Sequence, residues 1–246
     1  MSDDAIPAAT LILWRDLRTG PEILVVQRSS RMAFAAGAIV FPGGRVDQAD
    51  RDFAAAMGRP EEAAKITAIR ETVEETGVAP AISGAHPALG LQLQQSLIDG
   101  EDFCELLDRH ELELDLDRLT PFARWMPAFK QPRKFDTLFF LTAAPSGEWP
   151  PNPQEEECVA AEWASPEELV DRIEYGEANA IFPTKRNLER LAQHRRLDSA
   201  LADARAHSLD TIIPWVEDIG GEPHVRIPND RGYPVTSEPL TTAFRA

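Results

Sequence analysis

Three glutamates, Glu71, Glu74 and Glu75, are spaced so that a helix would bring their carboxylates together. At about 100° per residue, Glu71 and Glu75 lie about 40° apart, and Glu74 lies about 60° from Glu71 on the other side. Like charges at this spacing weaken a helix, and negative charge at its C-terminal end opposes the helix dipole. Compact sets of carboxylate oxygens are the ligands that Mg2+ or Mn2+ prefers. The spacing therefore predicts a divalent-cation site.

The helix that must carry these glutamates is predicted over residues 61–76. Pro60 precedes it, and Gly77 stands where helices commonly end in a left-handed residue. Its apolar residues recur at helical spacing and would face a core; they are Ala63, Ile66, Ile69 and Val73. A solvated acidic face is the alternative interpretation of the glutamates.

Residues 70–77, R-E-T-V-E-E-T-G, are followed by Val78 and resemble the second half of the Nudix box, G-x5-E-x7-R-E-U-x-E-E-x-G-U, in which U is bulky and apolar. Glu62 fits the first Glu, and Thr72 takes the place of an apolar residue. The opening Gly corresponds best to Gly44 in the F-P-G-G run at 41–44. The resemblance then implies a loop insertion at about 46–57, which a surface loop accepts at small entropic cost.

The residues before the box are similar to a motif of coenzyme A-directed Nudix hydrolases, L-L-x-x-R-S-x3-R-x3-G-x3-F-P-G-G. Arg28, Ser29 and Gly37 fall at the expected spacing, whereas Ala33 stands at the second Arg position and Arg31 lies two residues away. Arg28 is a candidate for contacting a substrate phosphate by charge-assisted hydrogen bonds. An exposed arginine at the end of a strand is the equal alternative.

The resemblance implies an α+β fold, a Nudix-type α/β/α sandwich with a mixed β-sheet, a helical insertion and a C-terminal extension. Residues 1–207 would form the hydrolase domain and residues 208–246 the extension. The implied reaction is metal-dependent hydrolysis of a nucleoside diphosphate linked to another moiety, with coenzyme A or acyl-CoA favoured. An ADP-ribose or NADH-type dinucleotide diphosphatase is a second interpretation. A binding module without hydrolysis is a third, and the clustered glutamates argue against it.

The resemblance also implies roles for particular residues. Glu71 and Glu75 are expected to be direct metal ligands, and Glu74 a further ligand or the general base. Arg70 is expected to pair with Glu74 at i, i+4 and to orient it. The backbone carbonyl of Gly44 is expected to contact a cation, which would be Mg2+ or Mn2+.

Two later segments supply further candidates. Glu157 is the first choice, and Glu156 the second, for a distant carboxylate of the metal site, with a solvated acidic loop as the alternative. Arg133 and Lys134 lie in the most basic short stretch of an acidic chain. They are candidates for holding a phosphate, with a solvated turn beside a strand as the equal alternative.

The remaining elements are predicted from periodicity. We predict strands over residues 6–14, 23–27 and 135–143, and we expect the strand at 135–143 to be buried. Residues 78–93 read as a strand and a loop, and 96–110 as a helix. Residues 158–163 read as a strand before a helix that starts at 165–169. Residues 183–206 read as one long amphipathic helix used for core or dimer packing, and the chain ends in a Pro-rich tail.

Composition limits the partners. The net charge of −16 argues against a general nucleic-acid binder, because phosphate backbones need a basic surface. Cys104 and Cys158 offer neither a disulfide framework nor metal-ligand spacing. No signal peptide and no apolar run of membrane-spanning length is evident, so we expect a cytoplasmic protein without membrane partners. The expected partner is a small nucleotide diphosphate, and a homodimer is an option.

Overall fold

Two long strands form the centre of the fold, β1 (Ala5–Leu17) and β2 (Gly20–Arg28), which run antiparallel on either side of a tight turn. The computed structural model describes residues 5–31, 35–127 and 134–243. The remaining strands of the main sheet are β3 (Ala38–Val40), β4 (Gly43–Arg45), β7 (Thr120–Trp125), β8 (Lys134–Ala143), β9 (Cys158–Ala164) and β10 (Asn179–Ala180).

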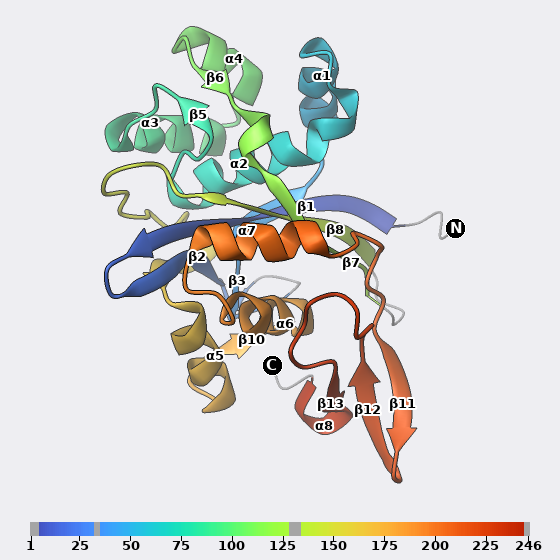
Figure 1. The fold of residues 1–246 in the computed structure, drawn as a ribbon. Coiled ribbons are helices and arrows are strands. Elements are labelled where there is room, and N and C mark those ends of the chain that lie inside the picture. The colour runs from blue at the N-terminus through green and yellow to red at the C-terminus, as the bar shows by residue number, and fades with distance from the viewer. Residues whose placement is uncertain (1–4, 32–34, 128–133, 244–246) are drawn as a thin grey trace.

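The main sheet is mixed, as predicted. Within the described residues its main path runs β10-β3-β2-β1-β8-β7, with β4 paired to β1 and β9 paired to β2. The β1–β8 and β3–β10 pairs are parallel, and the other pairs are antiparallel. Figure 1 shows helices on both sides of this sheet, which confirms the predicted α/β/α sandwich.

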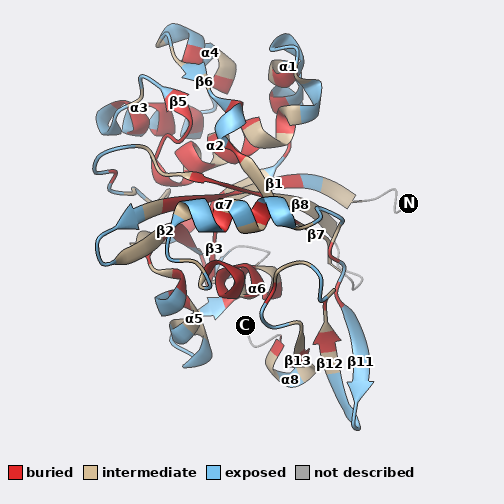
Figure 2. Cartoon of the chain, in the orientation of Figure 1, coloured by how far each residue is buried: buried red, intermediate tan, exposed pale blue. Residues whose placement is uncertain are grey.

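Each face of the sheet has its own core because strand side chains alternate between faces. Leu11 and Leu13 of β1 pack with the first group of helices, and Ile12 and Trp14 pack with the second. The first group is α1 (Gln48–Ala56), α2 (Ala63–Thr76), α3 (Pro87–Ile98) and α4 (Phe103–Arg109). The second group includes α5 (Pro166–Glu174), α6 (Phe182–Leu191) and α7 (Leu197–Ala206). In Figure 2 the buried residues gather on the sheet and on the helix faces turned toward it.

Helix α2 is the predicted box helix and closely matches its predicted bounds. A 3-10 turn, η1 (Pro60–Glu62), precedes it, so the α-helix begins at Ala63. Ile66 and Ile69 are fully buried, and burial of one such side chain contributes about 2 kcal/mol. Gly77 ends the helix with a φ of +68°, in the left-handed region. The predicted C-terminal stop is therefore confirmed.

The segment after α2 differs from the prediction. Residues 78–93 contain β5 (Ile82–Ser83) and most of α3 rather than a strand and a loop, and β5 pairs with β6 (Glu113–Leu114). His86 begins α3 by accepting the N–H of Leu89, and Pro87 occupies the first turn. The predicted helix over 96–110 is split at Gly100, whose φ of +86° ends the continuous helix.

The single long helix predicted over 183–206 is wrong, because α6 and α7 are separate helices. Buried Arg190 donates to Asp203 of α7 at 2.7 Å, which requires the chain to fold back. The N–H of Leu197 donates to Asp16 at the end of β1 at 3.2 Å. A buried guanidinium needs a carboxylate partner. The helix is interrupted between Leu191 and Leu197, so that Arg190 reaches Asp203.

The C-terminal segment is not a detached tail. It forms a three-stranded sheet of β11 (Trp215–Ile219), β12 (Glu222–Arg226) and β13 (Ser237–Pro239), followed by α8 (Leu240–Ala243). Val225, Ile227 and Tyr233 are buried in the same core as α6 and α7. No helix in the described ranges is both long and apolar enough to cross a membrane. The cytoplasmic location and the homodimer stay predictions.

Candidate active site

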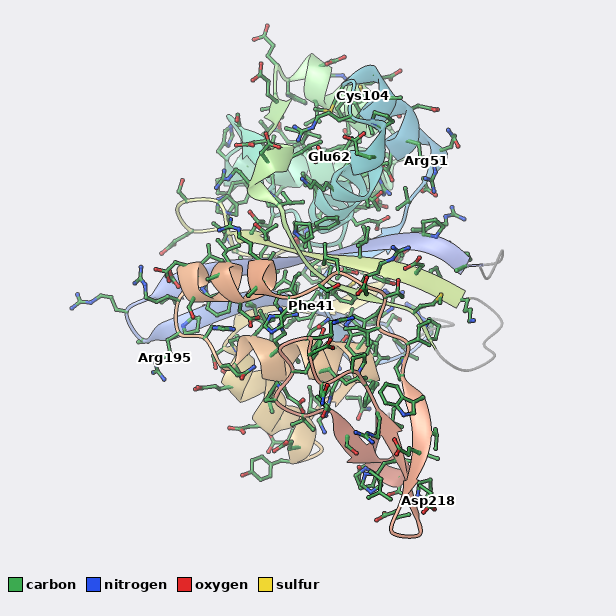
Figure 3. The ribbon with its side chains drawn as sticks, turned by 45° about the vertical axis from the view of Figure 1, so that its right-hand side comes forward. Phe41, Arg51, Glu62, Cys104, Arg195 and Asp218 are labelled. Carbon is green, nitrogen blue, oxygen red and sulfur yellow. The ribbon has the colours of Figure 1, made fainter. Side chains whose placement is uncertain are left out.

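The acidic end of α2 lies against Gly43 and Gly44, which begin β4. The N–H of Gly43 donates to Glu75 Oε2 at 3.1 Å. A Cβ on Gly44 would lie 2.4 Å from the carboxyl carbon of Glu71, so the carboxylate packs directly against the Gly44 backbone and any larger residue would displace it. Phe41, which Figure 3 labels, lies just before β4. It packs edge-on against Phe139 in the opposite core. The predicted proximity of the F-P-G-G run to the glutamates is confirmed, whereas the contact of the Gly44 carbonyl with a cation stays a prediction.

Arg70 holds two of the three glutamates. Its Nη1 lies 2.9 Å from Glu71 Oε1 and 3.2 Å from Glu74 Oε2. The predicted i, i+4 pair with Glu74 is therefore confirmed. The shared guanidinium keeps both carboxylates at the same side of α2 as Gly44.

The strongest partner of Arg70 is Asp50, which the sequence analysis did not identify. Its carboxylate accepts from Arg70 Nε at 2.9 Å and Nη2 at 3.0 Å, and from Thr67 Oγ1 at 2.7 Å. Asp50 is only 2% exposed and lies on α1. Bidentate pairs of this kind fix the orientation of a guanidinium. Asp50 therefore positions Arg70, and through it Glu71 and Glu74.

The contact between Asp50 and Arg70 changes where the insertion in the Nudix box is placed. Five residues separate Gly44 from Asp50, which is the spacing of the Nudix box with Asp in place of Glu. Nineteen residues separate Asp50 from Arg70, twelve more than the seven of the motif. The extra residues therefore follow Asp50 rather than spanning 46–57, and they form the rest of α1 and η1. Glu62, which the sequence pattern aligns with the first Glu of the box, pairs instead with Arg59 and Lys65.

Burial disfavours the ionised form of the three carboxyl groups and raises the pKa of each. Burial raises the pKa of Glu71 to about 7, with the charge of Glu74 adding to this and Arg70 opposing it. The pKa of Glu75 is raised well above its usual value by complete burial and by the charge of Glu71. Burial also raises the pKa of Glu74. A cation that binds these groups would offset the cost of their negative charge.

The donor set fits a hard divalent cation. Glu71 and Glu75 place carboxylate oxygens against Gly44 and Gly43 of β4, and Glu74 shares Arg70 with Glu71. Among the residues that the structure describes, no three His, Cys, Asp or Glu groups already converge as ligands of one ion. Arg70 accounts for this, because it takes the oxygens of Glu71 and Glu74. Glu71 would have to turn from Arg70 to bind a cation.

Arg28 and Glu157 lie beside Glu75. Arg28 ends β2 and is 15% exposed, with its Nη1 4.0 Å from Glu75 Oε1. The alternative of an exposed arginine at the end of a strand is therefore right about the strand end and wrong about the exposure. Its buried Nε has no hydrogen-bond partner within the described part of the chain. Glu157 is exposed, and its negative charge contributes to the raised pKa of Glu74 and Glu75.

Backbone contacts explain how the distant Glu157 reaches the site. The N–H of Ser29, next to Arg28, donates to the Glu157 carbonyl at 2.7 Å. The N–H groups of Gln154 and Asn152 donate to the carbonyls of Glu75 and Thr76 at 3.1 and 2.8 Å. The loop before β9 is therefore bonded to the end of α2, where helix carbonyls lack internal partners.

The remaining candidates are Lys134, Glu156 and Arg133. Lys134 begins β8 opposite Ala5, four positions before Leu138, which pairs with Ala9 beside Gly44. Glu156 is exposed in the turn before β9. Arg133 lies outside the described residues. The substrate and metal roles of these residues stay predictions.

The sandwich fold and the acidic helix end beside the Gly-Gly start of β4 define a Nudix-type hydrolase. The chain matches no family model. The crystal structure of a Nudix hydrolase from Alicyclobacillus acidocaldarius is 30% identical with a TM-score of 0.70, and the match covers 85% of this chain and 99% of that one. The chain belongs to the Nudix hydrolase family.

Two curated relatives carry a more specific name. Acyl-coenzyme A diphosphatase NUDT19 from Homo sapiens is 27% identical over 254 residues, and its counterpart from Gallus gallus is 28% identical over 255 residues. Each match covers 80% of this chain. The match spans 67% of the human protein and 66% of the chicken protein.

Proposed function

We propose that this chain is a divalent-metal-dependent diphosphatase that cleaves the diphosphate of coenzyme A or acyl-CoA. The products would be 3′,5′-ADP and 4′-phosphopantetheine or its acyl derivative. The observation that carries the proposal is the pair Glu71 and buried Glu75, whose carboxylates lie against Gly44 and Gly43 of β4. Similarity to proteins named acyl-coenzyme A diphosphatase supports the substrate.

Mg2+ or Mn2+ is the proposed cofactor. Glu71, Glu75 and the carbonyl of Gly44 would hold it, with Glu157 as a further carboxylate. When bound, such an ion lowers the pKa of water and neutralises charge on a diphosphate.

The chain itself would supply orientation and a proton acceptor. Glu74 is 32% exposed and is held by Arg70, so it can take a proton from an attacking water. The pair of Asp50 and Arg70 fixes the direction of this carboxylate. The buried Nε of Arg28 finds no hydrogen-bond partner in the described ranges, and a phosphate oxygen would satisfy it.

The proposal is tested with coenzyme A, an acyl-CoA, ADP-ribose and NADH as substrates, each with Mg2+ or Mn2+. We expect release of 3′,5′-ADP from the coenzyme A compounds with the highest kcat/KM, loss of activity with chelator, and recovery on adding the ion. A higher kcat/KM for ADP-ribose or NADH would reassign the substrate. Release of no phosphomonoester from any of the four would make the chain a binding module.

A further inference from the structure

A pocket of about 320 Å3 begins at the catalytic helix and ends at α4. Arg70 and Glu74 line one end of it, so the pocket adjoins the proposed reaction centre. In Figure 3, Cys104 of α4 and Arg51 of α1 lie on the same side of the sheet, above α2. Ligand pockets start at about 300 Å3, so this volume suits one arm of a small molecule.

Apolar side chains line part of the pocket, and acidic side chains, buried Asp50 among them, line the rest. Phe53 of α1 packs edge-on against Phe103 of α4 with ring centroids 6.5 Å apart, and buried Leu97 lies beside them. Five of the twelve lining residues are acidic and only Arg70 is basic. Arg45 and Arg109 pair with carboxylates at the rim, yet carboxylates still outnumber guanidinium groups five to three.

This charge pattern discriminates between the two halves of coenzyme A. The adenosine half carries a 3′-phosphate, which a carboxylate rim repels. The pantetheine arm is uncharged, combines apolar carbons with amide and hydroxyl donors, and can donate to carboxylate oxygens. We infer that the pocket between α1, α2 and α4 binds the pantetheine arm of the substrate. The inference rests on the proposed function, and it gives the extra residues after Asp50 a role in substrate recognition.

The test fills the pocket and measures the binding of each product half by calorimetry in the presence of Mg2+. Ala49 lines the pocket and is exposed, so Ala49→Trp narrows the pocket without disturbing a core. Ala55 is exposed on the same helix and does not line the pocket, so Ala55→Trp is the matched control. Cys104→Phe fills the pocket from the opposite wall and serves as the independent second variant.

We expect Ala49→Trp and Cys104→Phe to raise the Kd for 4′-phosphopantetheine by about tenfold or more. The Kd for 3′,5′-ADP should stay within about twofold, and Ala55→Trp should change neither value. An unchanged Kd for 4′-phosphopantetheine in either folded variant, or a rise for 3′,5′-ADP instead, would overturn the inference. Turnover of coenzyme A by the unmodified protein distinguishes failure of the pocket inference from failure of the proposed function. Without that turnover, the proposed function is overturned as well.

Discussion

Replacing Asp50 by Asn tests whether α1 controls the catalytic helix. Asp50 is 2% exposed and accepts three side-chain hydrogen bonds, two of them from Arg70. Breaking a buried ion pair costs about 3–5 kcal/mol, and Asn retains one acceptor, so we expect a loss of about 3 kcal/mol. At about 2–4 °C per kcal/mol for a chain of this size, Tm should fall by about 6–12 °C. Because Arg70 is then free to turn, kcat should fall by about tenfold or more.

Thermal unfolding and steady-state kinetics measure both effects. Asp52→Asn is the matched control, because Asp52 lies on the same helix, is exposed and bonds only Gln48 among the described residues. Asp50→Glu restores the residue of the Nudix motif, and we expect it to recover most of kcat. If Asp50→Asn matches Asp52→Asn in kcat and in Tm to within about 2 °C, the positioning role of Asp50 is refuted.

Three further substitutions or conditions test the site. Glu75→Gln should lower kcat by about a hundredfold or more and abolish Mg2+ binding while circular dichroism stays unchanged; normal activity would remove Glu75 from the metal site. Arg28→Ala should raise KM about tenfold with little change in kcat, and a normal KM would leave Arg28 without a substrate role. In chelator, Tm should fall as pH rises from 4.5 to 7, because the raised pKa of Glu71, about 7, makes the folded chain bind more protons than the unfolded chain over this interval. The free energy of unfolding should fall by about 3 kcal/mol over this interval, and Glu71→Gln should reduce that loss. A Tm that rises between pH 4.5 and 7 would contradict the raised pKa of Glu71.

The box helix was predictable because its signals are local. The spacing of Glu71, Glu74 and Glu75, the apolar stripe and Gly77 each depend on residues within a few positions along the chain. Strand β1 was predictable for the same reason, since its apolar residues form one continuous run. The proximity of Gly44 to Glu71 came only through the resemblance, because no local signal joins two residues that far apart.

The Asp50 contact was missed although its spacing was visible. Asp50 stands at the motif distance from Gly44, but Glu62 stands at the motif distance from Arg70, and each choice moves the insertion. Only the packing of α1 on α2 decides between them. The break between α6 and α7 was equally hidden, because residues 192–196 contain neither Gly nor Pro. It depends on Arg190 meeting Asp203 and on Leu197 meeting Asp16.

The loop before β9 closes the C-terminal end of α2 with the N–H groups of Asn152 and Gln154. These amides can exchange with deuterium only when the hydrogen bonds between the loop and the helix end break. Ser29 is joined to the same loop through the carbonyl of Glu157. The strand end that carries Arg28, the helix end that carries Glu75 and the loop that carries Glu157 should therefore open as one cooperative unit, with equal protection factors at these amides.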